Sequence, residues 1–122
     1  MRLKRPDLLK WQWTNYPLAH RARRNLVIHA LTMPLFFVGS VLVIAAIRVP
    51  ILVIPGVVFT AGTVAAQGRG HRGETNAPIP FEGPLDVVTR LFVEQWVTFP
   101  RFVISGGFLR AWRASATDVP PV

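Results

Sequence analysis

The sequence contains no cysteine, so disulfide bonds and thiolate metal sites are excluded. Charged residues are also scarce, at 16% of the chain against about 25% in typical soluble domains. Negatively charged residues are the scarcer kind, with 6 Asp and Glu against 14 Lys and Arg, which leaves a formal net charge of +8. In a soluble domain this charge would favour nucleic acid, but here the basic residues flank apolar runs, as in membrane proteins. We therefore expect a membrane, and no nucleic acid, as partner.

The first residues, MRLKRPDLLKWQW, are not followed directly by the apolar segment and small-residue cleavage site of a signal peptide. We therefore do not expect a cleavable signal at this end. A length of 122 residues is enough for one domain and too short for two. We expect a single domain over 1–122, with its core at about 16–107 and a tail at 114–122.

Two long runs without Asp, Glu, Lys or Arg occupy the middle of the chain, at 26–47 and 49–67. A helix over the first run would reach about 33 Å, close to the hydrocarbon thickness of a bilayer. The break between the runs is only a few residues long, so they predict an antiparallel helical hairpin. A chain of this length cannot bury two such helices on all sides, which favours a membrane hairpin over a soluble one.

Arginines mark the open end of this hairpin much more strongly than its tip. Three precede the first run, two follow the second and one lies at the tip: Arg21, Arg23 and Arg24; Arg69 and Arg72; Arg48. The positive-inside rule therefore predicts that both ends of the hairpin face the cytoplasm.

The C-terminal part begins with the proline-rich loop APIPFEGP and continues as LDVVTRLFVEQWVTF. Asp86, Arg90 and Glu94 follow one another at i,i+4 spacing on one helical face. This face is either a solvated stripe of ion pairs or the wall of a polar cavity, and the sequence leaves both readings open. We expect Pro100 to interrupt this segment before a second short amphipathic piece. The expected class is all-α, a membrane hairpin with amphipathic, membrane-associated helices in a small bundle.

The chain has three histidines, and all lie near the open end of the predicted hairpin. His20 and His29 flank the start of the first long helix, and His71 follows the end of the second. Neutral imidazole is a common ligand of iron and zinc, so their convergence predicts a metal site. In one straight helix His20 and His29 would face opposite sides. Either the helix begins after His20, or one histidine is no ligand, or there are two metal sites, whereas Asn25 and His29 do share a face.

A carboxylate follows the last histidine closely, because Glu74 is three residues after His71. In a helical turn it would complete the two-histidine, one-carboxylate triad of non-haem iron oxygenases. Gly68, Gly70 and Gly73 favour a non-helical turn instead, in which Glu74 would lie beside the ligands or act as an acid or base. A phosphate-binding loop is disfavoured, because GRGHRG lacks the Lys-Ser/Thr of a P-loop.

These residues resemble the pattern of the Mpo1-like family. The matching positions are Tyr16, His20, Asn25, His29 and Pro34, followed by Gln67, Gly70, His71 and Glu74. The resemblance covers about 16–107, and the stretch PFEGPLDVVTRLFVEQWVTFPRFVISGG looks like bacterial members. Characterised eukaryotic members are endoplasmic-reticulum membrane proteins, iron(II)-dependent dioxygenases that shorten 2-hydroxy fatty acids by one carbon.

The resemblance implies a membrane-embedded non-haem Fe(II) dioxygenase acting with O₂ on 2-hydroxy fatty acids or a related lipid. It implies a multi-pass protein of the bacterial inner (cytoplasmic) membrane, with the histidines on the cytoplasmic side. The implied metal ligands are His20, His29 and His71, and the candidate catalytic residues are Asn25, Gln67 and Glu74. Arg69, Arg72 and Arg90 are candidates for binding the substrate carboxylate.

One departure from the family pattern concerns the loop after His71. Gly73 precedes Glu74 where eukaryotic members have an aromatic residue, and this loop shapes the expected pocket. Two other classes of function remain open: a small protein that binds haem through two histidines, and a non-catalytic membrane scaffold. Whether the chain forms a homo-oligomer also stays open.

Overall fold

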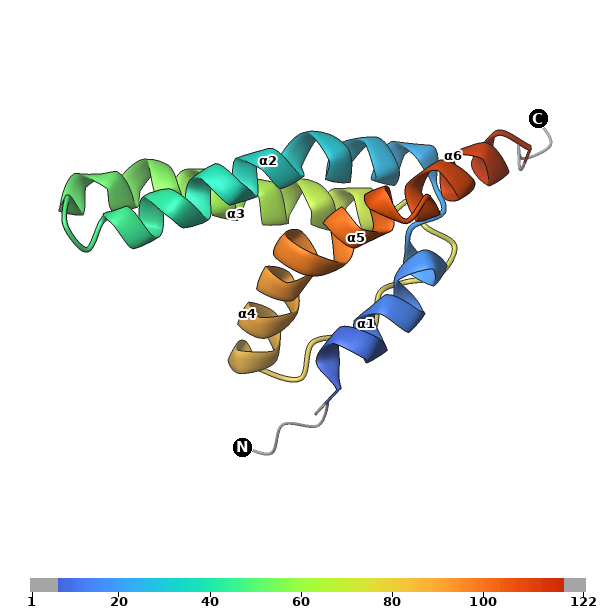
Figure 1. Cartoon of the computed structure of the whole chain (residues 1–122), viewed down its shortest axis with the longest axis horizontal. Helices are drawn as coiled ribbons and strands as arrows, with labels where there is room; N and C mark the ends of the chain where they lie inside the picture. Colours follow the sequence, from blue (N-terminus) through green and yellow to red (C-terminus); the bar gives the residue numbers. More distant parts are fainter. Residues whose placement is uncertain (1–6, 118–122) are drawn as a thin grey trace.

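The computed structural model describes residues 7–117, and every regular element in that part of the chain is helical (Figure 1). The all-α class is therefore confirmed. The last helix, α6, continues through Thr117, into the segment for which we expect a tail, and residues 118–122 lie outside the described part. In chain order the elements are α1 (Leu8–Asn15), η1 (Tyr16–Ala19), α2 (Arg23–Ala45), η2 (Pro50–Leu52), α3 (Val53–His71), α4 (Pro84–Val93), η3 (Glu94–Thr98), α5 (Phe99–Ile104) and α6 (Gly107–Thr117).

The long hairpin predicted from the two uncharged runs is formed by α2 and α3, which lie side by side and antiparallel (Figure 1). Each helix, α3 together with the preceding turn η2, is long and apolar enough to cross a membrane. Only 22% and 17% of their most apolar stretches are buried within the protein, so most of this surface faces outward. Such exposure suits lipid better than water. The cytoplasmic orientation of the open end remains a prediction.

Small residues bring the two helices of the hairpin into close contact. A Cβ atom on Gly39 would lie 2.8 Å from Cγ2 of Thr60 and 3.0 Å from the carbonyl oxygen of Gly56. A Cβ atom on Gly56 would lie 2.9 Å from the backbone nitrogen of Val43. Glycine is therefore needed at both positions for this close approach, as is common between membrane helices.

The segment after the proline-rich loop runs from α4 through η3 into α5 without a break, so the predicted interruption at Pro100 is wrong. A proline normally clashes with the carbonyl group four residues earlier and lacks an N–H to donate. Here η3 is a wider π-helical turn, in which the N–H of Phe99 bonds to the carbonyl oxygen of Glu94. This wide turn accommodates Pro100, and it also sets the direction in which Glu94 projects.

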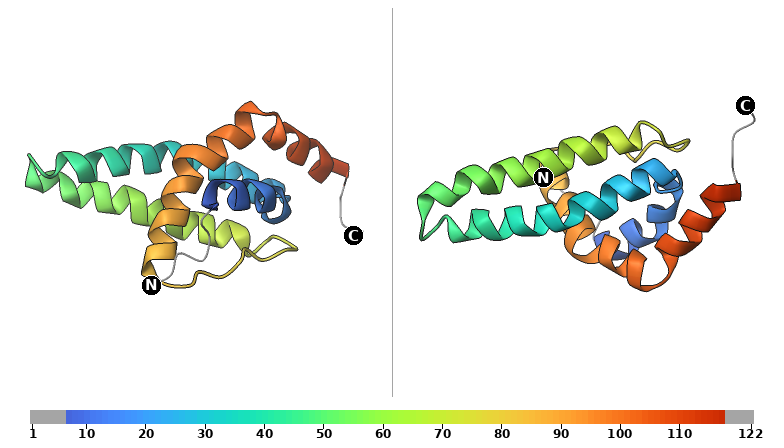
Figure 2. Two further views of the ribbon diagram at one scale, coloured as in Figure 1. Left: turned by 60° about the horizontal axis from the view of Figure 1, so that its bottom comes forward. Right: turned by 90° about the horizontal axis from the view of Figure 1, so that it is seen from above.

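This continuous segment crosses the hairpin instead of running along it (Figure 2). The ring of Phe92 packs edge-on against Phe36, with 5.2 Å between centroids, and Trp96 lies 4.3 Å from Phe37. The indole N–H of Trp96 donates to Oγ of Ser40 at 3.2 Å. These contacts attach the segment to the middle of α2.

The outer face of α4 and of the turn η3 that follows it is apolar. Leu85, Val88, Phe92 and Trp96 lie three or four residues apart and are each 43% to 53% exposed. Through Phe92 and Trp96 this face continues into the exposed apolar surface of the hairpin. An exposed apolar face on an amphipathic helix beside an apolar hairpin is typical of a helix that lies in a membrane surface.

We expect α4 to lie in the membrane interface, and single spin labels can measure this because the chain has no cysteine of its own. In liposomes, a label at Val88→Cys should collide more with O₂ than with a water-soluble nickel chelate. A label at Ile44→Cys, exposed on the hairpin, is the lipid reference, and one at Thr75→Cys, in an exposed loop, is the aqueous control. This placement would be contradicted if the chelate reached the Val88 label as readily as the Thr75 label. Coupling between Val88 labels of two copies would also contradict it, because the face would then be covered by protein.

A small aromatic core joins this segment to the open end of the hairpin. Tyr16 of η1, Leu26 of α2 and the α5 residues Phe99 and Phe102 are buried together. Trp112 of α6 packs against this cluster. The core therefore holds η1, α2 and α5 as one unit at the end of the hairpin where the histidines lie.

Candidate metal centre

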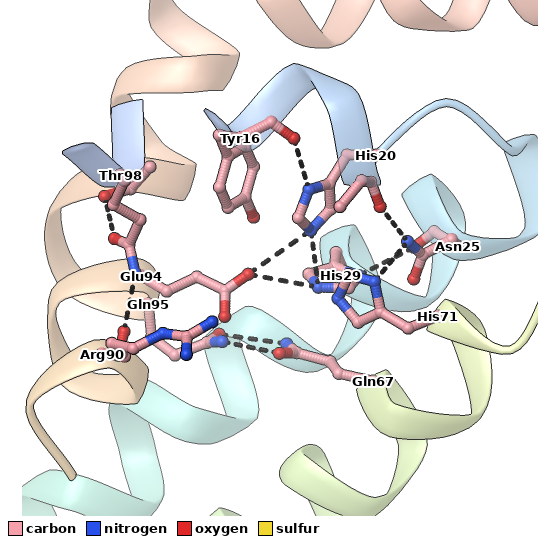
Figure 3. Close-up of polar contacts among 12 residues, drawn as sticks. Tyr16, His20, Asn25, His29, Gln67, His71, Arg90, Glu94, Gln95 and Thr98 are labelled. Carbon is pink, nitrogen blue, oxygen red and sulfur yellow. Dashed lines mark hydrogen bonds and ion pairs between the residues drawn. The ribbon is translucent and has the colours of Figure 1, made fainter. Parts of the chain in front are cut away.

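The three histidines come from three places in the fold and meet at the open end of the hairpin (Figure 3). His29 lies near the start of α2, His71 ends α3, and His20 lies in the bend between η1 and α2. Their ring centroids are 4.6 to 5.1 Å apart. Because α2 begins only at Arg23, His20 is outside the helix, which is the first of the three alternatives that the sequence leaves open. His20 and His29 can therefore face the same point.

A fourth group, the carboxylate of Glu94, enters this cluster from η3. Its Oε2 lies 3.4 Å from Nε2 of His20 and 3.4 Å from Nε2 of His29, and the two Nε2 atoms are 3.2 Å apart. One ligand atom from each of these residues and from His71 lies within 4.8 Å of the others. Metal–ligand bonds of about 2.0–2.2 Å would bring such atoms together around one ion.

Backbone carbonyl groups fix the orientation and the tautomer of two of the rings. Nδ1 of His20 lies 2.8 Å from the carbonyl oxygen of Tyr16, and Nδ1 of His29 lies 3.0 Å from that of Asn25. A carbonyl oxygen only accepts, so each Nδ1 carries a proton and each Nε2 is directed at Glu94. Histidines that ligate metals are commonly held in this way. Two Nε2 lone pairs and a carboxylate repel one another unless a metal ion or protons lie among them, so the donor set fits a metal.

The charge of Glu94 is consistent with this arrangement. Burial alone would raise the pKa of Glu94, but hydrogen bonds and electrostatic attraction from His20 and His29 outweigh it and hold the pKa well below its usual range. A divalent ion bound by these residues would act in the same direction. Glu94 is therefore an anionic donor in either state.

A pair of buried amides holds the turn that carries Glu94. Nε2 of Gln67 donates to Oε1 of Gln95 at 3.0 Å, and Nε2 of Gln95 donates back at 2.6 Å. Gln67 also donates to Oγ1 of Thr32 at 3.0 Å. Both amide N–H groups of Gln67 are thus used within the protein, and its evident contribution is to position η3 beside α3.

Gln12 of α1 holds the same turn from the other side. Its Nε2 donates to the carbonyl oxygen of Arg90 at 3.0 Å, and its Oε1 accepts a hydrogen bond from the hydroxyl of Thr98. These two contacts lie on either side of Glu94 in the chain. The side chain is buried, so water does not compete for these bonds.

Glu74 lies outside the ligand cluster and binds the start of α2. Its carboxylate accepts hydrogen bonds from the backbone N–H groups of Arg21 and Ala22 at 2.9 to 3.1 Å and from Nδ2 of Asn25 at 2.7 Å. The positive end of the helix dipole favours a carboxylate at this point. Of the two readings left open for Glu74, the triad is therefore not formed; Glu74 lies beside the ligands, and Glu94 supplies the carboxylate.

Asn25 connects several parts of the centre. Its Nδ2 lies 3.2 Å from the carbonyl oxygen of Ala19 and 3.5 Å from Nδ1 of His71. The backbone carbonyl oxygen of Asn25 accepts the hydrogen bond from Nδ1 of His29. Gly70 permits this packing, because a Cβ atom there would overlap Oδ1 of Asn25. Asn25 therefore positions ligands and does not itself belong to the ligand set.

Arg90, a predicted substrate-binding residue, is buried in the cavity wall and bound to the proline-rich loop. It donates to the carbonyl oxygens of Ile79 at 2.7 Å and Pro80 at 3.1 Å, and it lies 3.4 Å from Asp86. Its guanidinium group lies 4.3 Å from the centroid of the Phe81 ring. Arg90 thus anchors the loop that forms one wall of the cavity.

A cavity of about 510 Å³ adjoins the cluster, and its lining includes His71 and Glu94. The remaining walls are mostly apolar and come from α1, α3, α4 and the loop that contains Phe81. The size suits an amphiphilic small molecule. Arg69 and Arg72, also predicted to bind substrate, are exposed and do not line this cavity.

Compared with known protein-family models, curated proteins and solved structures, the chain matches none of them. The Mpo1-like resemblance therefore remains an expectation from the sequence.

Proposed function

We propose that this protein is a membrane-associated non-haem iron(II) dioxygenase that acts on a 2-hydroxy fatty acid or a related amphiphilic acid. The observation that carries this proposal is the cluster of His20, His29, His71 and Glu94, with ligand atoms within 4.8 Å of one another. Imidazole and carboxylate groups suit iron(II) and also zinc. The choice of iron and of substrate rests on the Mpo1-like resemblance.

Some residues of the proposed site would bind the metal ion, and others position the ligands. The three imidazoles and Glu94 would hold the ion, while Asn25 and the backbone carbonyl groups keep the rings in place. A bound ferrous ion would act as a Lewis acid for the hydroxy acid and would pass electrons from it to O₂. The apolar cavity would receive the acyl chain and exclude water from the reacting end. Arg90 is paired with Asp86, and its part here is to hold the loop that forms one wall of the cavity.

The overall reaction balances without a separate reductant. A 2-hydroxy acid and O₂ give the acid one carbon shorter, CO₂ and water, so the substrate supplies every electron that O₂ takes up. Two atomic features favour this class over bis-histidine haem. The Nε2 atoms of His20 and His29 are 3.2 Å apart, and Glu94 lies beside both, which leaves no room for a porphyrin ring between the histidines.

The test is anaerobic purification with ferrous iron, metal analysis, and measurement of O₂ consumption. We expect about one iron per chain, and O₂ uptake with release of CO₂ and the shortened acid when a long-chain 2-hydroxy fatty acid is added. The unsubstituted fatty acid is the matched control and should react poorly, because it lacks the hydroxyl oxygen. Iron-loaded protein that consumes no O₂ with 2-hydroxy acids of several lengths would contradict the proposal, and an intense Soret band would indicate haem.

A further inference from the structure

The ring of Tyr16 is fixed against the candidate metal centre. It stacks on His20 with centroids 3.7 Å apart and an angle of 11° between the planes. Phe102 and Phe99 pack edge-on against it at 5.1 and 6.4 Å, and its backbone carbonyl group accepts the Nδ1–H of His20. The ring is held on several sides, so the position of its hydroxyl group is defined.

That hydroxyl group has no hydrogen-bond partner among the described residues, although its oxygen is excluded from solvent and Tyr16 is only 4% exposed. Buried hydroxyl groups are nearly always bonded. Tyr16 lines the same cavity as His20, His71 and Glu94. Figure 3 shows the hydroxyl directed toward the side of the cluster where Glu94 enters. An acceptor in the cavity would satisfy this group.

The hydroxyl also keeps its proton. A phenol has an ordinary pKa of about 10, so the Tyr16 hydroxyl is protonated at neutral pH. Tyr16 therefore presents a hydrogen-bond donor beside the centre. Burial first, and then the charge of Glu94 and a hydrogen-bond interaction with it, raise the pKa of Tyr16, so the Glu94 carboxylate is the competing acceptor. No hydrogen bond of ordinary geometry joins the two groups, and Oε2 of Glu94 faces His20 and His29 at 3.4 Å.

We propose that Tyr16 is a ligand-binding residue whose hydroxyl donates a hydrogen bond to an oxygen atom of the molecule that occupies the cavity. The class of ligand is an amphiphilic acid, which presents a carboxylate or hydroxyl oxygen to Tyr16 and an apolar chain to the cavity walls. The identity of the acid rests on the proposed function. The hydrogen bond needs only the centre and the cavity, and it does not depend on reaction with O₂.

The first test uses the unmodified chain, because Tyr16 is its only tyrosine. Ultraviolet resonance Raman bands of tyrosine distinguish a free hydroxyl from one that donates, so in this protein they report on Tyr16 alone. The protein is loaded anaerobically with cobalt(II) and titrated with 2-hydroxyhexadecanoic acid. We expect the bands to change from the free to the donating state in proportion to bound acid.

The second test compares Tyr16→Phe with the wild-type protein. Phenylalanine keeps the stack on His20 and removes only the hydroxyl, so cobalt content should be unchanged. The dissociation constant for 2-hydroxyhexadecanoic acid, followed by the visible spectrum of cobalt, should rise about tenfold or more, as for loss of a hydrogen bond to a charged acceptor. Trp13→Phe is the matched control, because Trp13 is a neighbouring aromatic residue that does not line this cavity.

Three results would overturn the inference: no binding of the acid, tyrosine bands that already show a donating hydroxyl and do not respond to the acid, or equal affinity in Tyr16→Phe and wild type. The second result would mean that the hydroxyl bonds to Glu94. If the acid binds as expected but iron-loaded protein consumes no O₂, the dioxygenase proposal fails while the role of Tyr16 stands.

Discussion

Replacing His29 with alanine should remove the metal from the protein. Nε2 of His29 lies 3.2 Å from that of His20 and 3.4 Å from Glu94, so it is in the middle of the donor set. The residue is also buried, and water cannot readily take its place as a ligand. Changes to groups that merely support ligands cost 10–100-fold in metal affinity, so loss of a ligand should cost at least about 100-fold. We expect almost no iron by metal analysis and no O₂ consumption.

The matched control for this change is Leu31→Ala, because Leu31 is on the same helix and is exposed. It should keep its iron. Circular dichroism of His29→Ala should show unchanged helix content, which separates loss of metal from unfolding. His20→Ala and His71→Ala should lose iron in the same way. Full iron occupancy in all three single histidine variants would rule out a shared centre.

Those parts of the fold that depend on local sequence were predictable. Two uncharged runs with a short break specify a hairpin, and a hairpin necessarily brings the start of one helix to the end of the other. The meeting of His29 and His71 follows from this alone. The position of His20 depended on where α2 begins, and the sequence left that open.

Glu94 is the site residue that sequence reasoning misses as a ligand. The i,i+4 series with Arg90 fits a solvated stripe as well as a cavity wall, and only packing against the hairpin decides between them. The structure favours the cavity for Arg90 and Glu94, because both line it. The direction of Glu94 also depends on the π-helical turn, which helical periodicity does not reveal. Pro100, six residues later, is the one local sign of an irregular helix.

For Glu74 the sequence leaves two readings open, a ligand of the triad or a residue beside the ligands, and the structure has the second. Three residues separate it from His71, but backbone N–H groups at the start of α2 compete for its carboxylate and bind it. Arg69 and Arg72 are candidates from the sequence for binding the substrate carboxylate. They are exposed, and the described cavity lies elsewhere.

The roles of the Glu94 and Glu74 carboxylates can be distinguished by making the same glutamate-to-glutamine substitution at each position. Glu94→Gln replaces an anionic donor with a weakly binding amide of the same shape, while the amide pair of Gln67 and Gln95 still holds the turn. We expect the affinity for iron(II) to fall by more than about tenfold, and O₂ consumption to fall with it. Competition with a coloured chelator measures the affinity, and the spin state of bound cobalt reports any change in ligand set.

Glu74→Gln should have the reverse pattern. The amide loses the charge that binds the N–H groups of Arg21 and Ala22, which should cost about 1 kcal/mol of stability at the start of α2. The substitution leaves all four candidate ligands in place, so the protein should bind about one iron per chain with nearly unchanged affinity. Turnover should fall modestly, because Glu74 holds Asn25 and the bend that carries His20. Loss of iron in Glu74→Gln with full occupancy in Glu94→Gln would assign the carboxylate ligand to Glu74 and overturn the centre described here.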